Sequence, residues 1–320
     1  MPKILRINKQ SIQLGENAIV NLNISRLPSR TKIDIPLYVF RGLEDGPVVL
    51  LIGGLHGDEL NGIEIIRRLI FNKHIKTIKG TIICIPILNM YGFLNLSRTT
   101  PDGKDLNRSF PGSLNGSLAS RVAYQVTKEI LPVIDFGIDF HTGGASRSNI
   151  PQIRCDFKFE KNLELAYLFE PKLLINSELV DKSLRKTAQK LGKPILVFEG
   201  GESLRFDDDS IEAGILGTRK LLKSIGMIKD DFAYSKQETT ILNHSSWIRA
   251  KAAGLFRPVK KNGEKVKKGQ VMGLITDPYG DFEVTQKAPH DCLIFGVNNM
   301  PVVHQGEAIF HIGVEYVCVE

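Results

Sequence analysis

The segment VVLLIGGLHGDELNGIEIIRRLI, residues 48–70, joins a strand-like run, a turn and an amphipathic helical pattern in one stretch. The apolar run at residues 48–52 leads into two glycines, and the apolar residues after Glu59 recur with a helical period. A strand that passes through a glycine-rich turn into a helix is typical of α/β proteins, which bind ligands at the carboxyl ends of their strands. His56, Asp58 and Glu59 stand in this turn, so the segment indicates both a fold class and a functional site.

Strand-like and helical patterns alternate on both sides of this segment through the first two-thirds of the chain. The further strands expected are PLYVF (36–40), TIICIPILN (81–89), FGIDFH (136–141) and PILVFEGG (194–201), and the helices expected lie near 59–71, 118–131, 178–191 and 211–226. This alternation predicts an α/β domain at residues 1–229, with a mixed, mostly parallel sheet and helices on both faces.

The pattern changes after residue 229. Short β-like pieces, such as GLFRPV and APHDCLIFGV, are separated by turns, and Gly and Pro punctuate them at short intervals. We therefore expect a second, small all-β domain at residues 230–320. A length of 320 residues fits two domains.

Composition and charge argue against several classes of protein, among them nucleic-acid-binding and membrane proteins. The formal net charge is +7, but the Lys and Arg residues are scattered, and only KKNGEKVKKG (260–269) is locally dense. No nucleic-acid-binding motif accompanies that charge, so we expect no nucleic-acid partner. No signal-peptide pattern and no membrane-length apolar run is evident, and four cysteines lack paired spacing. A cytoplasmic protein with reduced thiols and no membrane partner is expected; a homo-oligomer is possible.

His56 and Glu59 have the spacing HxxE at a strand-to-helix turn, so both side chains can converge on one point. Zinc accepts imidazole nitrogen and carboxylate oxygen together, and a catalytic zinc site needs three protein ligands. His141, at the end of the strand-like run FGIDFH, is the best third candidate. A polar turn and a structural histidine are the alternatives, and Asp58 is interpreted as the N-cap of the helix.

Two other fragments carry polar residues suited to catalysis. The turn-rich loop at residues 97–112 contains Arg98, Asn107 and Arg108, which can bind a carboxylate, although a solvated basic loop is the alternative. Glu199 ends the strand-like run PILVFEGG and could act as a general base, with Glu202 as the less attractive candidate. Asp139 and Asp105 could orient a ligand or an arginine.

Taken in order, HGDE, DLNR, DFHTGG and VFEGG resemble the succinylglutamate desuccinylase/aspartoacylase family, relatives of the zinc carboxypeptidases, over about residues 45 to 225. The resemblance implies that one Zn²⁺ per chain is held by His56, Glu59 and His141. It also implies roles for four further residues: Glu199 as general base and proton donor, Arg98 as the group that polarises the scissile carbonyl, and Asn107 and Arg108 as carboxylate-binding residues.

The function implied is that of a zinc-dependent deacylase, which removes the acyl group from a small N-acyl amino acid or a related N-acyl amine. A carboxypeptidase that cuts a peptide's C-terminus and a non-catalytic binding protein on the same fold are the alternatives. The C-terminal part resembles the barrel-sandwich hybrid of biotinyl and lipoyl domains, but the carrier lysine of those domains is not recognisable. We expect it to be a structural or substrate-gating appendage.

Overall fold

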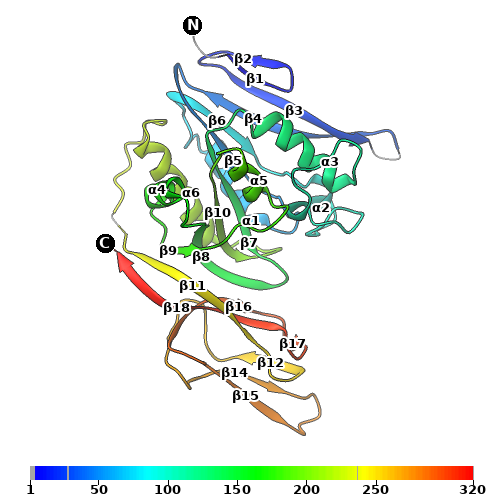
Figure 1. The fold of residues 1–320 in the computed structure, drawn as a ribbon, viewed down its shortest axis with the longest axis vertical. Helices are drawn as coiled ribbons and strands as arrows, with labels where there is room; N and C mark the ends of the chain where they lie inside the picture. Colours follow the sequence, from blue (N-terminus) through cyan, green and yellow to red (C-terminus); the bar gives the residue numbers. More distant parts are fainter. Residues whose placement is uncertain (1–3, 27–28, 236, 320) are drawn as a thin grey trace.

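The computed structural model describes residues 4–26, 29–235 and 237–319, and its centre is one large mixed sheet (Figure 1). In spatial order its twelve strands are β13 (Lys265–Val266), β16 (Cys292–Asn298), β18 (Ala308–Val319), β11 (Thr239–Arg249), β9 (Leu173–Asn176), β8 (Arg147–Cys155), β10 (Ile195–Glu202), β7 (Phe136–Gly143), β5 (Glu44–Ile52), β6 (Lys79–Ile85), β4 (Lys32–Arg41) and β3 (Asn17–Arg26). A separate hairpin is formed by β1 (Leu5–Ile7) and β2 (Gln10–Ile12).

The sheet contains both parallel and antiparallel strand pairs. Strand β5 pairs in parallel with β6 and β7, and β10 pairs in parallel with β7. Beyond this core, β4 is antiparallel to β3 and β6, and β8 is antiparallel to β10. A mixed α/β sheet is confirmed. Parallel pairing joins β6, β5, β7 and β10 and, separately, β8, β9 and β11, whereas strands that follow each other closely in the chain, such as β3 and β4, pair antiparallel.

Helices cover both faces of the sheet. One face carries α1 (Leu60–Phe71), α4 (Glu160–Phe169) and α6 (Asp208–Ser224), and the other carries α3 (Leu118–Gln125), the π-helix η2 (Val126–Ile130) and α5 (Leu184–Lys190). Strand β5 is buried on both sides, because Val49 and Leu51 pack toward the first group while Leu50 and Ile52 pack toward the second. Its continuous apolar sequence is the pattern expected of a doubly covered strand.

Two helices differ from their sequence prediction. The helix expected near 178–191 begins only at Leu184, because the Ser183 hydroxyl accepts a hydrogen bond from the Lys186 amide and caps the helix there. The helix expected near 118–131 changes from α to π at Val126. Three helical elements were not expected, namely α4, α2 (Met90–Leu94) and the 3-10 turn η1 (Leu106–Arg108), and neither were the strands β1, β2, β3, β8 and β9.

The strands after residue 230 contribute to two sheets. Strand β11 pairs in parallel with β9, and β16 pairs with β8, so these strands continue the large sheet. Four others form a separate antiparallel sheet, β15 (Glu283–Lys287), β14 (Val271–Thr276), β12 (Gly254–Pro258) and β17 (Val302–Val303). Phe256, Ile275 and Phe310 belong to the apolar core of this C-terminal part. The domain boundary at residues 229 and 230 stays a prediction.

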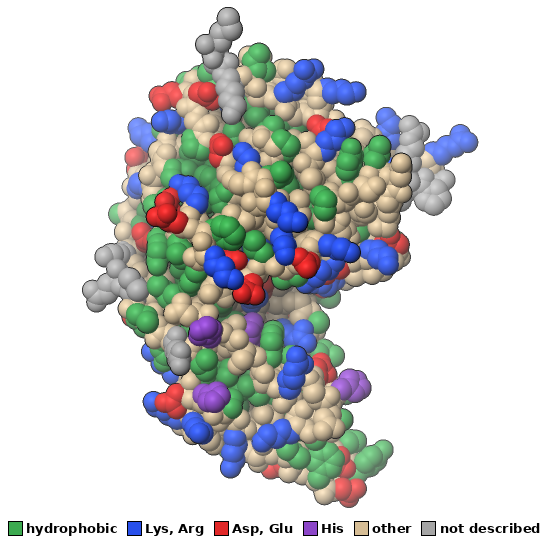
Figure 2. Space-filling model, in the orientation of Figure 1, with side chains coloured by type: hydrophobic (Ala, Val, Ile, Leu, Met, Phe, Trp, Pro, Cys, Tyr) green, Lys and Arg blue, Asp and Glu red, His purple; other side chains and the backbone are tan. Residues whose placement is uncertain are grey.

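The charged side chains on the surface are distributed as the sequence predicts. Lys and Arg side chains are scattered over the face shown in Figure 2 rather than gathered into one stripe. Cys84, Cys155 and Cys292 are buried and Cys318 is exposed, and all four are free thiols. Within the described ranges, no helix has the length and apolar character needed to cross a membrane.

Candidate active site

The turn between β5 and α1 is shaped by close backbone packing. An added Cβ at Gly57 would lie 1.9 Å from the backbone of Gly92 in α2, so only glycine fits there. Helix α1 starts after Glu59, which is the N-cap residue but makes no side-chain cap hydrogen bond. The prediction that Asp58 caps this helix is therefore wrong, because the chain enters the helix one residue later and leaves the Glu59 carboxylate directed toward His56.

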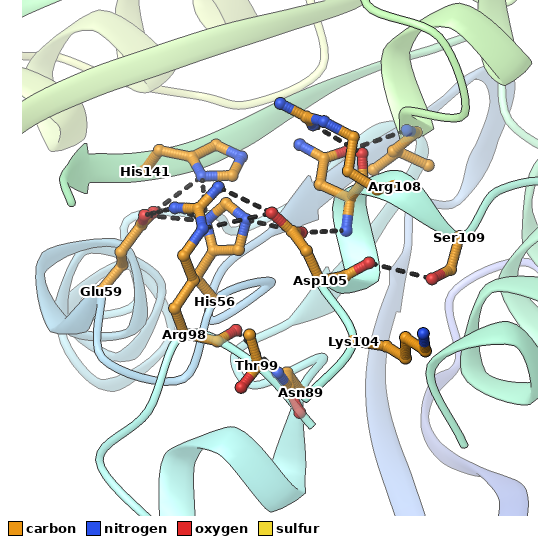
Figure 3. Close-up of polar contacts among 12 residues, drawn as sticks. His56, Glu59, Asn89, Arg98, Thr99, Lys104, Asp105, Arg108, Ser109 and His141 are labelled. Carbon is orange, nitrogen blue, oxygen red and sulfur yellow. Dashed lines mark hydrogen bonds and ion pairs between the residues drawn. The ribbon is translucent and has the colours of Figure 1, made fainter. Parts of the chain in front are cut away.

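His56, Glu59 and His141 form one buried group of candidate metal ligands (Figure 3). The Nδ1 atoms of His56 and His141 lie 3.2 Å apart, and each lies 2.7 Å from an oxygen of Glu59. Their donor atoms all fall within 4.8 Å of one another, and the three residues are at most 5% exposed. Two strand ends, those of β5 and β7, bring them together because the two strands are neighbours in the parallel part of the sheet.

Asp139 orients His141. Both lie on β7 two residues apart and share one face, and the His141 Nε2 group donates to the Asp139 carboxylate at 2.8 Å. That bond leaves Nδ1 as the lone-pair nitrogen that faces Glu59 and His56, which is the arrangement typical of a metal-bound histidine. Two imidazole nitrogens and a carboxylate oxygen directed at one point are consistent with a single metal ion.

The charges in this group are strongly coupled. Burial alone would lower the pKa of His141, but Asp139 and Glu59 outweigh it and hold that pKa well above its ordinary value. Burial likewise opposes the charged form of Glu59, yet the two imidazoles keep the pKa of Glu59 well below its ordinary value. For His56, burial is outweighed by Glu59 and Asp105, and the pKa is raised. The group thus favours positive charge beside the Glu59 carboxylate, which either protons on the imidazoles or a bound cation would supply.

Arg98 reaches this group from the loop after α2. Its Nη1 lies 3.1 Å from Glu59 Oε1 and 3.2 Å from His56 Nδ1. Its Nε and Nη2 groups donate to Asp105 Oδ2 at 3.2 and 3.1 Å. The other oxygen of Asp105 accepts from the Asn107 amide at 2.7 Å and lies 3.4 Å from His56 Nε2. Asp105 therefore holds the guanidinium of Arg98 beside the candidate ligands.

Asn107 and Arg108 lie in the turn η1, at the mouth of the same cavity. The Asn107 side-chain oxygen accepts from the Leu184 amide at 2.9 Å, which ties η1 to the start of α5. Arg108 is exposed and donates from Nη1 to the Asn107 carbonyl at 2.8 Å. The guanidinium is thus anchored at one group and free to bind an anion with its others.

Glu199 lies on β10 opposite His141 of β7 in the parallel ladder. Its carboxylate accepts from Asn149 Nδ2 at 2.6 Å and lies 3.3 Å from Arg154 Nη1. Glu202, the alternative base, accepts from Asn299 Nδ2 at 2.7 Å and does not line the cavity. A register shift lies between the two glutamates, and of the two only Glu199 lines the cavity that contains the candidate metal group.

All seven residues named from the sequence as site residues line one cavity of about 500 Å³. The cavity also contains residues that sequence reasoning missed: Arg147, Arg154, Arg185 and Trp247. Arg185 is only 8% exposed, and its Nη2 donates to Ser177 Oγ and to the Glu178 carbonyl. Its position early in a short polar helix carries no signal of a buried role. Trp247 lies on β11, far along the chain, and nothing in its local sequence connects it to the site.

Comparisons with known proteins identify the family of this chain. Residues 45–225 match the succinylglutamate desuccinylase/aspartoacylase catalytic domain. The chain is 29% identical over 254 residues to the N-alpha-acetyl-L-2,4-diaminobutyric acid deacetylase of Halomonas elongata, covering 76% of this chain and 74% of that protein.

Solved structures share the fold over nearly the whole chain. A succinylglutamate desuccinylase from Silicibacter sp. TM1040 has a TM-score of 0.85 at 21% identity, covering 98% of this chain and 97% of that one. The product-bound ectoine utilization protein EutE (DoeB) from Ruegeria pomeroyi has a TM-score of 0.82 at 22% identity, covering 94% and 95%. At these identities the likeness establishes the fold.

Proposed function

The chain belongs to the succinylglutamate desuccinylase/aspartoacylase family and is a metal-dependent amide hydrolase, and from this premise we propose that it deacylates a small N-acyl amino acid with one zinc ion per chain. The observation that carries the proposal is the buried group of His56, Glu59 and His141, which faces a cavity lined by Glu199 and several arginines. Two imidazoles and one carboxylate are a ligand set suited to zinc.

The residues present fit a zinc ion. The contact between His141 and Asp139 fixes the tautomer that presents Nδ1, and Glu59 offers an oxygen to each histidine. When bound, zinc supplies a Lewis acid that polarises a carbonyl and lowers the pKa of water. The side chains of the cavity bind the substrate and transfer the protons.

Glu199 is proposed as the general base. Its carboxylate takes a proton from the attacking water and later returns that proton to the nitrogen of the leaving amine. Asn149 and Arg154 bind its two oxygens, which fixes the direction of the carboxylate before substrate arrives. The position of Glu199 beside His141 in the ladder supports this role.

Arg98 is proposed to stabilise the negative charge that develops on the scissile carbonyl oxygen. Its guanidinium is held by Asp105 on one edge and reaches the candidate ligands with the other. A fixed donor aimed at a developing oxyanion stabilises the transition state more than the ground state. Asn107 and Arg108 are proposed to bind the substrate's α-carboxylate at the cavity mouth, which orients the amide toward the buried end.

The test combines metal analysis with a hydrolysis screen. The purified protein is expected to contain about one zinc per chain. Among N-acetyl, N-succinyl and longer N-acyl amino acids, with N-α-acetyl-L-2,4-diaminobutyrate included, at least one is expected to be hydrolysed to an amino acid and a carboxylic acid. Chelation should abolish turnover and added zinc should restore it. Activity that survives complete removal of the metal would refute the proposal.

A further inference from the structure

Arg147 is an arginine of the cavity wall without an acidic partner. It is the first residue of β8, and its Nε is buried without a hydrogen-bond partner in the described part of the chain. No described carboxylate forms an ion pair with its guanidinium, which instead lies 5.5 Å from the centre of the Trp247 ring. A guanidinium with unused donors that faces a cavity is a binding group for an anion.

The C-terminal strands fix the backbone of this arginine. Arg147 pairs with Asn298 of β16, and the neighbouring Ser146 carbonyl accepts from the Asn299 amide at 2.9 Å. On the other side, Asn262 Nδ2 donates to the Ser148 carbonyl at 2.9 Å. The segment that carries Arg147 is therefore held by β16 and by the loop before β13, both from the region after residue 230.

The indole of Trp247, beside Arg147, packs on uncharged aromatic rings. Trp247 stacks on His311, with ring centres 3.9 Å apart and planes inclined by 13°, and His311 in turn lies 4.1 Å from the ring of Phe295. Burial, together with the charges of Arg154 and Arg147, lowers the pKa of His311 to about 2, so this imidazole is neutral. A stack of neutral rings supports the guanidinium without neutralising its charge.

The charges that line the cavity indicate that it binds more than one anionic group of a ligand. Five arginines and three acidic residues line it. Arg98 forms ion pairs with Glu59 and Asp105, and Arg154 forms one with Glu199, whereas no described carboxylate forms an ion pair with Arg108, Arg147 or Arg185. A single α-carboxylate bound at Arg108 would leave the guanidinium of Arg147 uncompensated. Glu199, which accepts a hydrogen bond from Asn149 two positions along β8, is paired with Arg154, and no described carboxylate forms an ion pair with Arg147.

We infer that Arg147, supported by Trp247, is a specificity-determining residue that binds a second carboxylate of the substrate. The inference rests on the proposed function for the identity of the substrate as an N-acyl amino acid. The second carboxylate belongs either to the amino-acid side chain or to the far end of the acyl group. In both cases the guanidinium donates charge-assisted hydrogen bonds to it, and the C-terminal strands complete the wall that selects it.

Binding can be measured without turnover, because Trp247 is the chain's one tryptophan and its fluorescence reports on this wall. The probes are amines that lack the amide carbonyl. N-ethyl-L-glutamate and N-ethyl-L-glutamine test a side-chain carboxylate, and N-(3-carboxypropyl)-L-alanine and N-butyl-L-alanine test an acyl-chain carboxylate. The zinc-loaded wild type should bind the charged member of one pair about tenfold to hundredfold more tightly than the neutral member.

Arg147→Gln should remove that preference, and Arg147→Lys should restore only part of it, because an ammonium lacks the planar fork. Arg257→Gln is the matched control, since Arg257 is exposed on β12 away from the cavity, and it should keep the wild-type preference. Equal affinity for both members of both pairs, or a preference that persists in Arg147→Gln, would overturn the inference. If the preference holds but the zinc-loaded protein cleaves no N-acyl amino acid, the proposed function fails and the anion site stands.

Discussion

The two ends of the catalytic cavity are built in opposite ways. At the inner end, His56, Glu59 and His141 are buried and in contact with one another. At the outer wall, Arg147 has unused donors and Trp247 is 38% exposed. At the inner end, the candidate metal ligands already contact one another before any substrate binds. At the outer wall, the guanidinium of Arg147 gains hydrogen-bond partners only when a ligand binds. This difference separates the reaction, which the family shares, from specificity, which belongs to the individual chain.

The largest effect is expected from the inner end. His141→Ala removes one of three candidate metal ligands, so zinc content should fall well below one per chain and kcat/KM should fall by a factor on the order of a thousand or more. Metal analysis and initial rates measured on the same sample check this. His304→Ala changes an exposed histidine far from the cavity and should keep both metal and activity. Full zinc content in His141→Ala would mean that the ligand set is assigned incorrectly.

Glu199→Gln keeps the metal group intact and removes only a carboxylate. General-base catalysis contributes about a hundredfold to ten-thousandfold, so kcat should fall by that factor while zinc content stays unchanged. Glu202→Gln is the matched control, because Glu202 bonds to Asn299 outside the cavity. If Glu202→Gln loses activity and Glu199→Gln does not, the base is the other glutamate.

Asp139→Asn tests whether the inner end depends on its supporting contacts. The amide can still occupy the position, but it binds the His141 Nε2–H less strongly and allows the wrong tautomer. Loss of such an orienting carboxylate costs about tenfold to hundredfold in metal affinity. Competition with a chromogenic zinc chelator measures this directly. Unchanged affinity would show that the histidine is oriented by the fold alone.

The inner end could be predicted from the sequence because its signals are local. His56 and Glu59 lie within four residues at a strand-to-helix turn, and His141 ends a recognisable buried strand. Parallel strands that are neighbours in a sheet bring such ends together, so the residues made the group a candidate, and the resemblance to the family implied that all three hold the metal. The N-cap residue was predicted wrongly because N-cap preferences favour Asp58 over Glu59, and only the backbone path shows that the helix begins after Glu59.

The outer wall could not be predicted because it depends on long-range strand pairing. Arg147 and Trp247 are brought together by the pairing of β16 with β8 and of β11 with β9, which joins segments distant from each other in the chain. The small-domain pattern after residue 230 gave no sign that its strands continue the large sheet. Register between distant strands is set by packing that one sequence does not reveal.

The smallest effect is expected on stability, at the base of the outer wall. The pKa of His311 is lower in the folded chain than in the unfolded chain, so below about pH 6.5 the unfolded chain binds one more proton than the folded chain. The neutral side chain of His311 therefore contributes to the free energy of unfolding above that pH. This contribution is lost as the pH falls toward about 2. Between pH 7 and pH 5 this costs about 2 kcal/mol of unfolding free energy.

His311→Phe keeps the ring stack and removes the titrating group, so it should lose less stability over that interval than the wild type. Denaturant unfolding at both pH values gives the two differences, and all other titrating groups cancel in the comparison. His304→Phe, which changes an exposed histidine, should follow the wild type. Equal losses in His311→Phe and the wild type would mean that His311 titrates normally, and that the outer wall rests on a base that gains charge as the pH falls.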